Sequence, residues 1–375
     1  MDIEPPSPVV PWPVRPARSD DNAALLDLVE ACPVRASFSL RVSRRPDFFA
    51  LTRLAGEWWR VLVVEAAEGT LVGCITVLGR RCWIGGEPRP SLYVGDLRVH
   101  PAWRGRGVGD VLASAAMGMA ADIDPDMPGL MTVLAGNRPM GSRIAGKGGI
   151  PPFERFATLR LFTIPLIRRR SPAGSLRITR AGPQDAGEMA ALWSRLAPAR
   201  QFTQARDEAS LSEWVASAPG FDWQCYWLAR QPNGRLAGFL AAWDERACKE
   251  TTVLDYSYGT AAFRAGYNLV APALGGARLP RRGETLDTLQ VVHLCVGPEE
   301  PGTLRALLLA AANGSRGRGS IALSVGLDLA DPLVRALAGI PAITTDVEAF
   351  VLTAAGPWRG TPLDDRPLHF ETALT

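Results

Sequence analysis

A short stretch in the first half of the chain alternates arginine with glycine. It contains Arg104, Gly105, Arg106, Gly107 and Gly109, and an amphipathic run that predicts a helix follows it. Glycines allow the backbone to turn sharply and to approach a ligand closely. The first N–H groups of a helix have no intrahelical partner, and they lie at the positive end of the helix dipole. The stretch therefore predicts a loop that binds phosphate groups, with the arginines adding charge-assisted hydrogen bonds.

The position of this loop distinguishes it from two other phosphate-binding loops. A dinucleotide-binding loop follows the first strand of its domain, and an acidic residue follows about 20 residues later. Here the loop comes after a predicted hairpin over 60–65 and 71–78, and no acidic residue ends the strand that follows about 20 residues later. A P-loop is excluded because it requires Gly-Lys-Ser/Thr, which is absent here.

The stretch 93–112 combines an apolar strand, a tight turn, the glycine-rich loop and a helix. It resembles the main motif of the GNAT superfamily of N-acetyltransferases, in which Arg/Gln-x-x-Gly-x-Gly/Ala follows an apolar strand. Arg104, Gly107 and Gly109 match that pattern. The resemblance implies acetyl-CoA or another acyl-CoA as co-substrate, and no metal ion.

In this family the loop N–H groups hold the pyrophosphate of coenzyme A, and a bulge in the preceding strand seats the pantetheine arm. The family often uses an asparagine near the cofactor, and Asn137, just past the strand that follows the loop, matches it. The residues that the resemblance assigns to the coenzyme are Leu97, Val99, Arg104, Gly105, Arg106, Gly107, Val108, Gly109 and Asn137.

The reaction that the resemblance implies is direct attack of an amine on the thioester. Such a step needs a base near the amine, a donor to the oxyanion and an acid for the sulfur. Asp96 is the candidate base, with Tyr93 as its competitor, and the N–H of Leu97 or Val99 is the candidate oxyanion donor. Where the family often has a tyrosine as general acid, this sequence has Ile144, which puts the standard acid step in doubt.

Three alternatives stay open. The domain could bind coenzyme A without catalysis, or it could use a longer acyl-CoA or an acyl carrier protein as donor. It could also modify lysine or N-terminal amines of proteins. The expected acceptor is therefore left as either a small-molecule amine or a peptide amine.

The elements around the motif predict an α+β fold. In the first half, strands are expected over 60–65, 71–78, 92–99, 130–134 and 156–165, helices over 107–121 and 138–146, and a polar excursion over 79–90. In the second half, strands are expected over 224–230, 236–243, 289–296, 321–325 and 347–353, and helices over 303–313 and 332–338. The repeated order predicts two tandem GNAT-like domains, each a mixed, mostly antiparallel sheet flanked by helices.

The predicted boundaries are a disordered segment over 1–12, a catalytic domain over 13–168, a linker over 169–175 and a degenerate domain over 176–375. The degenerate domain carries an insertion near 249–284, a length that is typical of a functional cover. The tandem outline is similar to that of the mycothiol synthases, although there the active copy is the second.

The second half lacks the phosphate loop. Pro298 and Pro301 remove N–H donors, and Glu299 and Glu300 would repel a pyrophosphate. His293 falls where Asp96 falls in the first half, and a satisfied interior histidine is expected there. This half is therefore expected to bind no coenzyme A.

Composition agrees with an ordinary globular protein. Of 375 residues, 47% are apolar and 21% are charged, which is enough apolar content for two cores. The net charge of +3 is too small to predict a nucleic-acid partner. No apolar run reaches the ~20 residues that span a bilayer, and the start lacks the features of a signal peptide, so a cytoplasmic, bacterial protein without a membrane partner is expected. The sequence contains no C-x-x-C pair, so it predicts no zinc site.

Overall fold

The computed structural model describes residues 12–35, 38–66, 69–137, 140–141, 144, 153–171, 174–354 and 363–374. The predicted disordered segment lies outside these ranges apart from Trp12, as do most of the predicted helix over 138–146 and part of the linker.

The chain folds into two halves that repeat one order of elements. The first half contains β1 (Val14–Pro16), α1 (Asn22–Glu30), β2 (Val34–Arg35), β3 (Phe38–Ser43), α2 (Ala50–Ala55), β4 (Trp58–Glu65), β5 (Leu71–Ile84), β6 (Glu87–Val99), α3 (Val108–Ile123), β7 (Gly129–Leu134) and β8 (Glu154–Pro165). The second half contains β9 (Arg177–Arg180), α5 (Ala186–Leu196), β10 (Thr203–Gln204), α6 (Glu208–Ser217), β11 (Tyr226–Arg230), β12 (Leu236–Trp243), β13 (Glu250–Tyr256), α7 (Tyr258–Val270), β14 (Thr288–Val296), α8 (Pro301–Ser315), β15 (Ala322–Asp328) and β16 (Ile343–Leu352).

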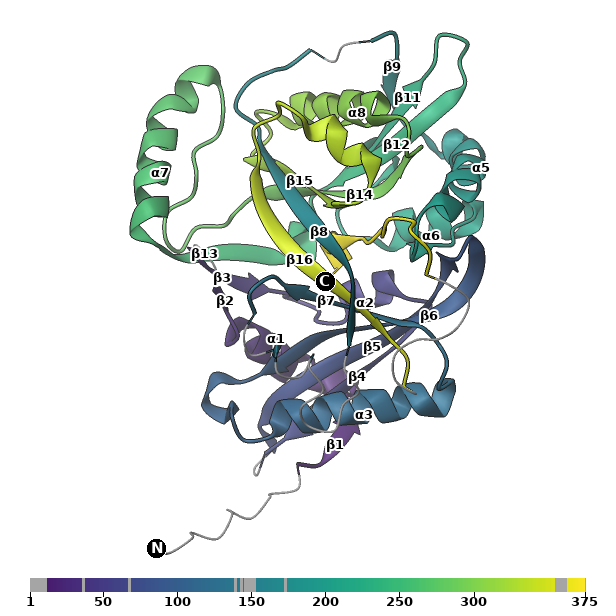
Figure 1. Ribbon diagram of the computed structural model, residues 1–375. Coiled ribbons are helices and arrows are strands. Elements are labelled where there is room, and N and C mark those ends of the chain that lie inside the picture. Colours follow the sequence, from purple (N-terminus) through teal and green to yellow (C-terminus); the bar gives the residue numbers. More distant parts are fainter. Residues whose placement is uncertain are drawn as a thin grey trace, which may run out of the picture.

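One large sheet runs through both halves in the order β1-β4-β5-β6-β7-β16-β8-β15-β14-β12-β11-β9. Most of its pairs are antiparallel, and only β6 with β7 and β14 with β15 are parallel. The predicted α+β class is therefore confirmed, with helices such as α3 and α8 covering the sheet (Figure 1).

The halves exchange their last strands. β16 of the second half lies between β7 and β8, and β8 of the first half pairs with β15 of the second. Figure 1 shows the two strands crossing together between the halves. The sequence predicted a closing strand near 156–165 but not this exchange.

The hydrophobic core follows the exchange. α3 buries Val108, Leu112, Ala116 and Ala120 at helical spacing against β4–β6. A second cluster lies under α8. The largest cluster joins residues of both halves, among them Tyr93 and Trp193, so the halves share part of their core.

Two segments differ from their sequence predictions. The polar excursion over 79–90 is instead the end of a long β5–β6 hairpin that turns at Gly85 and Gly86, both with positive φ. The insertion near 249–284 forms β13 and α7, and β13 pairs with β3 of the first half in a small sheet with β2. In the described part of the chain, none of the helices is long and apolar enough to cross a membrane.

Candidate acyl-CoA site

A cavity of about 970 Å³ lies between the glycine-rich loop, the end of β6, the α1–β2 connection and the end of β7. Of the nine residues that the sequence assigned to the coenzyme, the cavity is lined by Leu97, Val99, Arg104, Gly105, Gly107, Val108, Gly109 and Asn137. Residues separated by up to 40 positions thus meet in one place. Sequence reasoning missed Cys32 and its neighbours in the α1–β2 connection, which carry no motif.

The remaining residue, Arg106, is not among those that line the cavity. Its guanidinium lies over the ring of Trp103, 5.0 Å from the centroid, and its carbonyl accepts a hydrogen bond of 2.8 Å from Trp12. In this arrangement Arg106 fixes the outer side of the loop. Arg104 lines the cavity, and its Nε donates to the carbonyl of Val99.

The loop conformation explains two of its glycines. Gly105 has φ +75° and Gly107 has φ +82°, although a Cβ at either position would meet no atom within 4 Å. Backbone conformation rather than lack of space therefore requires glycine here. Gly107 is the N-cap of α3. Val108 and Gly109, the first two residues of this helix, line the cavity, and the first N–H groups of a helix have no intrahelical partner.

The strands β6 and β7 separate beside this loop. Their parallel pairing covers only Leu92 to Val94 of β6, whereas β6 continues to Val99. Asp96 has φ 54°, and the register between β5 and β6 shifts at this point. The predicted bulge is present, and it creates a wedge that opens toward the cavity.

Asp96 is tied into an ion-pair cluster. Its carboxylate accepts hydrogen bonds of 2.7 and 2.9 Å from Arg44 and one of 3.3 Å from Arg98. Burial alone would raise the pKa of Asp96, but the charges of Arg44 and Arg98 outweigh it and lower the pKa to about 2. A carboxylate held in this way accepts protons weakly, which counts against Asp96 as the base. Sequence reasoning missed Arg44, because nothing distinguishes it from the nearby arginines.

Tyr93 lies at the point where the strands separate. Its hydroxyl forms a hydrogen bond of 2.9 Å with Thr132 of β7. Burial raises the pKa of Tyr93 to about 12, so the phenol is protonated at neutral pH. This environment suits a proton donor better than a base.

Ile144, where the family often has its acid, packs in an apolar cluster with Met131, Val133 and Phe350. The cluster offers no proton donor to a leaving thiolate. Among the described residues, no group of three or more potential ligands could hold a metal ion.

Comparison with known proteins fits this geometry. Residues 25–133 match the model of the acetyltransferase (GNAT) family. This match lies within the first half and includes the wedge and the glycine-rich loop. No curated protein matches the sequence.

Solved structures match over both halves. N-myristoyltransferase from Saccharomyces cerevisiae with bound myristoyl-CoA has a TM-score of 0.64 at 12% identity, over 98% of this chain and 90% of that one. A GCN5-related N-acetyltransferase from Sphaerobacter thermophilus has a TM-score of 0.58 at 14% identity, over 92% of this chain and 96% of that one. At such identities the similarity shows the fold alone, and it supports a tandem GNAT-like architecture.

The second half preserves the wedge of the GNAT domain. β14 pairs with β15 only over Thr288 to Gln290 and then separates from it. His293 has φ 52°, matching Asp96 in its own half. The correspondence of these two positions, expected from the sequence, is thus visible in the backbone.

The chain itself occupies this second wedge. The N–H of His293 donates a hydrogen bond of 2.9 Å to the carboxylate of Glu371, and Leu368 N–H donates to Asp328 at the end of β15. Burial raises the pKa of Glu371 to about 7, although Arg206 opposes the shift. The C-terminal segment 363–374 therefore lies where the first half has open space.

His293 is fully buried, as expected, and its Nδ1 contacts the Tyr226 hydroxyl at 2.5 Å. Its Nε2 has no partner among the described residues, so the histidine is satisfied at one nitrogen only. Burial lowers its pKa well below the ordinary value, which keeps the ring neutral.

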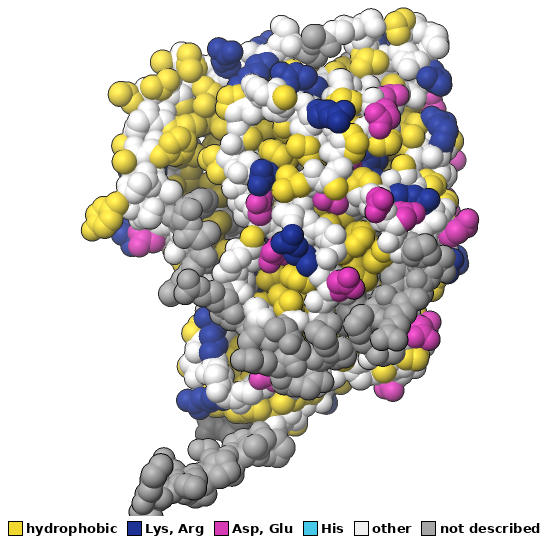
Figure 2. Space-filling model, viewed as in Figure 1, with side chains coloured by type: hydrophobic (Ala, Val, Ile, Leu, Met, Phe, Trp, Pro, Cys, Tyr) yellow, Lys and Arg dark blue, Asp and Glu magenta, His cyan; other side chains and the backbone are white. Residues whose placement is uncertain are grey.

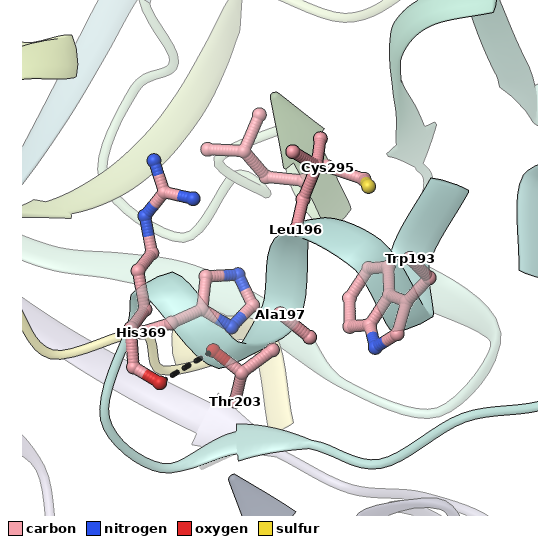
Figure 3. Close-up of a pocket in the computed structure, with 8 residues that line it drawn as sticks. Trp193, Leu196, Ala197, Thr203, Cys295 and His369 are labelled. Carbon is pink, nitrogen blue, oxygen red and sulfur yellow. Dashed lines mark hydrogen bonds between the residues drawn. The ribbon is translucent and has the colours of Figure 1, made fainter. Parts of the chain in front are cut away.

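Figure 3 shows a small cavity that remains beside this segment, with Trp193, Cys295 and His369 around it. Its volume is about 10 Å³, which is at most the space of one water molecule. A cavity of this size is far too small for an acyl-CoA.

The Arg44–Asp96 pair predicts a specific acid response. Because the folded-state pKa of Asp96 is lowered to about 2, its contribution to stability is present above the ordinary value near 4 and is lost as pH falls toward 2. Urea unfolding between pH 6 and pH 2 should show wild type losing about 2 kcal/mol more than the double variant Arg44→Met/Asp96→Asn, which has no such pair. Parallel pH profiles would contradict the assignment.

Gly107→Glu should abolish coenzyme A binding while the fold survives. The new side chain has free space, and the strained φ costs about 1 kcal/mol, but its carboxylate faces the predicted pyrophosphate site. Calorimetry should therefore detect no coenzyme A binding by this variant at concentrations that saturate wild type. Gly118→Glu, on an exposed turn of the same helix with equal space, is the matched control. Equal affinities in the two variants would refute the loop assignment.

Proposed function

We propose that this protein is an N-acyltransferase that moves an acyl group, most simply acetyl, from coenzyme A to a primary amine by direct attack. The observation that carries the proposal is the joint position of loop and wedge on one cavity. A pyrophosphate at the N-terminus of α3 and a thioester at the bulge of β6 would be joined by a pantetheine arm along Leu97 and Val99, which both line that cavity.

The end of the wedge supports the proposal of a short acyl group. The hydrogen bond between Tyr93 and Thr132 closes the direct path between the strands beyond the thioester position. This contact favours a short acyl group. The yeast N-myristoyltransferase of similar fold holds myristoyl-CoA, so a longer acyl-CoA donor is the second candidate.

The protons of the reaction need a base and an acid. The role of Asp96 as base stays a prediction, and its low pKa makes a water-mediated or orienting role more consistent with the ion pairs. Tyr93, protonated up to about pH 12, supports a role as proton donor to the leaving thiolate. The backbone N–H groups of Leu97 or Val99 remain the proposed oxyanion donors.

The acceptor side supports a small-molecule or peptide amine. β13 of the second half pairs with β3 of the first half, which brings the insertion against the half that carries the cavity. A cytoplasmic location is supported by the six cysteines, which are all free.

A thermal-shift titration tests the donor. Acetyl-CoA at 100 times its dissociation constant should add about 2.7 kcal/mol to stability, ADP should add much less, and palmitoyl-CoA should rank below acetyl-CoA. Release of free thiol with a panel of primary amines then measures turnover, with Gly107→Glu as the control that cannot bind the donor. No shift with any thioester would refute the proposal, and a shift without thiol release would favour a non-catalytic coenzyme A-binding module.

Asp96→Asn separates the roles of the carboxylate. If Asp96 takes the amine proton, kcat should fall about 100-fold or more, while acyl-CoA affinity changes little. Arg44→Met removes the partner of the carboxylate without removing the base, so it should lower stability and raise the pKa seen in the kcat profile. Wild-type turnover in Asp96→Asn would exclude Asp96 as base.

A further inference from the structure

The helix α7 of the insertion has its polar residues on the inner side. Arg264 donates from Nε to the carbonyl of Pro280 at 2.6 Å. Asn268 exchanges two hydrogen bonds with Leu279, of 2.7 and 3.0 Å. These contacts hold the helix against its own return segment, so its orientation is fixed by polar groups that face inward.

The outer side of the same helix is apolar and open. Tyr258 is 99% exposed, Leu269 82%, Val270 54% and Phe263 53%, and Leu274 in the following turn (η8, Pro272–Leu274) is 46% exposed. None of the residues of α7 is buried. This arrangement is the reverse of an ordinary surface helix, which turns its apolar side to the core. Figures 1 and 2 show the helix standing apart from the body of the protein with hydrophobic side chains on its surface.

Three segments at the base of this helix share a strong positive charge. Residues 257–283, 166–171 and 314–320 together contain nine arginines and no aspartate or glutamate. They contact one another, because Arg316 donates to the carbonyls of Ile167 and Leu274. Figure 2 shows arginine or lysine side chains gathered beside the hydrophobic helix.

Among the arginines of this cluster, Arg282 pairs with Asp255 at 3.5 Å. Burial and the nearby charges of Arg168 and Arg305 lower the pKa of Arg170, as expected where cations lie close together. We call the exposed apolar side of α7 and these three segments the α7 face. It combines an apolar helix surface with arginines, which is the composition of a helix that lies in the interface of a membrane.

We propose that the α7 face binds the surface of a membrane that contains anionic phospholipids. Phosphate headgroups would pair with the arginines, while Leu269, Val270 and Phe263 enter the boundary of the acyl chains. A symmetric second copy of the chain fits less well, because an isologous interface would bring the arginine clusters of both copies together. The 13 residues of α7 are too few to span a bilayer, so the contact is peripheral. The proposal departs from the sequence prediction of no membrane partner, which rested on a search for apolar runs that detects only spanning segments.

Co-sedimentation with vesicles tests the proposal in the full-length protein. Vesicles of phosphatidylcholine with 30 mol% phosphatidylglycerol should bind the protein at low salt, and vesicles of phosphatidylcholine alone should bind it much more weakly. Leu269→Glu should abolish binding. Arg168→Ser/Arg169→Ser should weaken it about fivefold for each arginine removed, and added salt should reduce the effect of this variant.

Matched control variants lie far from the α7 face. Ile123→Glu changes another exposed apolar residue at the end of α3, and Arg60→Ser/Arg81→Ser removes two exposed arginines of the first half; all three control changes should leave binding unaltered. Acyl transfer between soluble substrates should be the same in Leu269→Glu and wild type, so the result is independent of the proposed function. No binding of wild type to anionic vesicles, or equal binding by Leu269→Glu, would overturn the proposal. A wild-type dimer that Leu269→Glu dissociates, without lipid binding, would show that a second copy covers this face instead.

Discussion

The exchange of β8 and β16 is the constraint on which the rest of the structure depends. Each strand completes the half to which it does not belong in sequence, and together they join two five-strand units into one sheet. β16 pairs with β7, one side of the first wedge, and β8 pairs with β15, one side of the second wedge. The position of one site relative to the other is therefore set by backbone hydrogen bonds and not by a flexible linker.

The two wedges have diverged in what fills them. In the first half the left-handed residue at the bulge is Asp96, whose side chain is engaged by arginines, and the wedge opens into a large cavity. In the second half it is His293, and its N–H is taken by the carboxylate of Glu371. The same backbone geometry thus borders an open cavity in one half and the chain's own C-terminal segment in the other. The second half lacks the glycine-rich loop, and its own chain fills the wedge. Both features disfavour a coenzyme in this half.

Much of this could be predicted from sequence because its signals are local. The loop at Arg104–Gly109, the strand before it and the helix after it are adjacent in the chain, and the equivalence of Asp96 with His293 follows from counting along two similar strands. Arg44, Glu371 and the exchanged strands could not be predicted. Their partners lie 52, 78 and at least 157 residues away, and nothing in the local pattern of any of them indicates which distant strand or carboxylate it will meet.

The strand exchange also limits how this protein can change over evolutionary time. A domain that contains all of its own strands can be duplicated, lost or combined with new neighbours as a unit. Here a break in the linker would leave each half with an unpaired edge where the other half's strand belongs, so neither half is a transferable module. Selection therefore acts on the pair. The second half can change in sequence, but it cannot be deleted, because it supplies β16 to the half that contains the cavity.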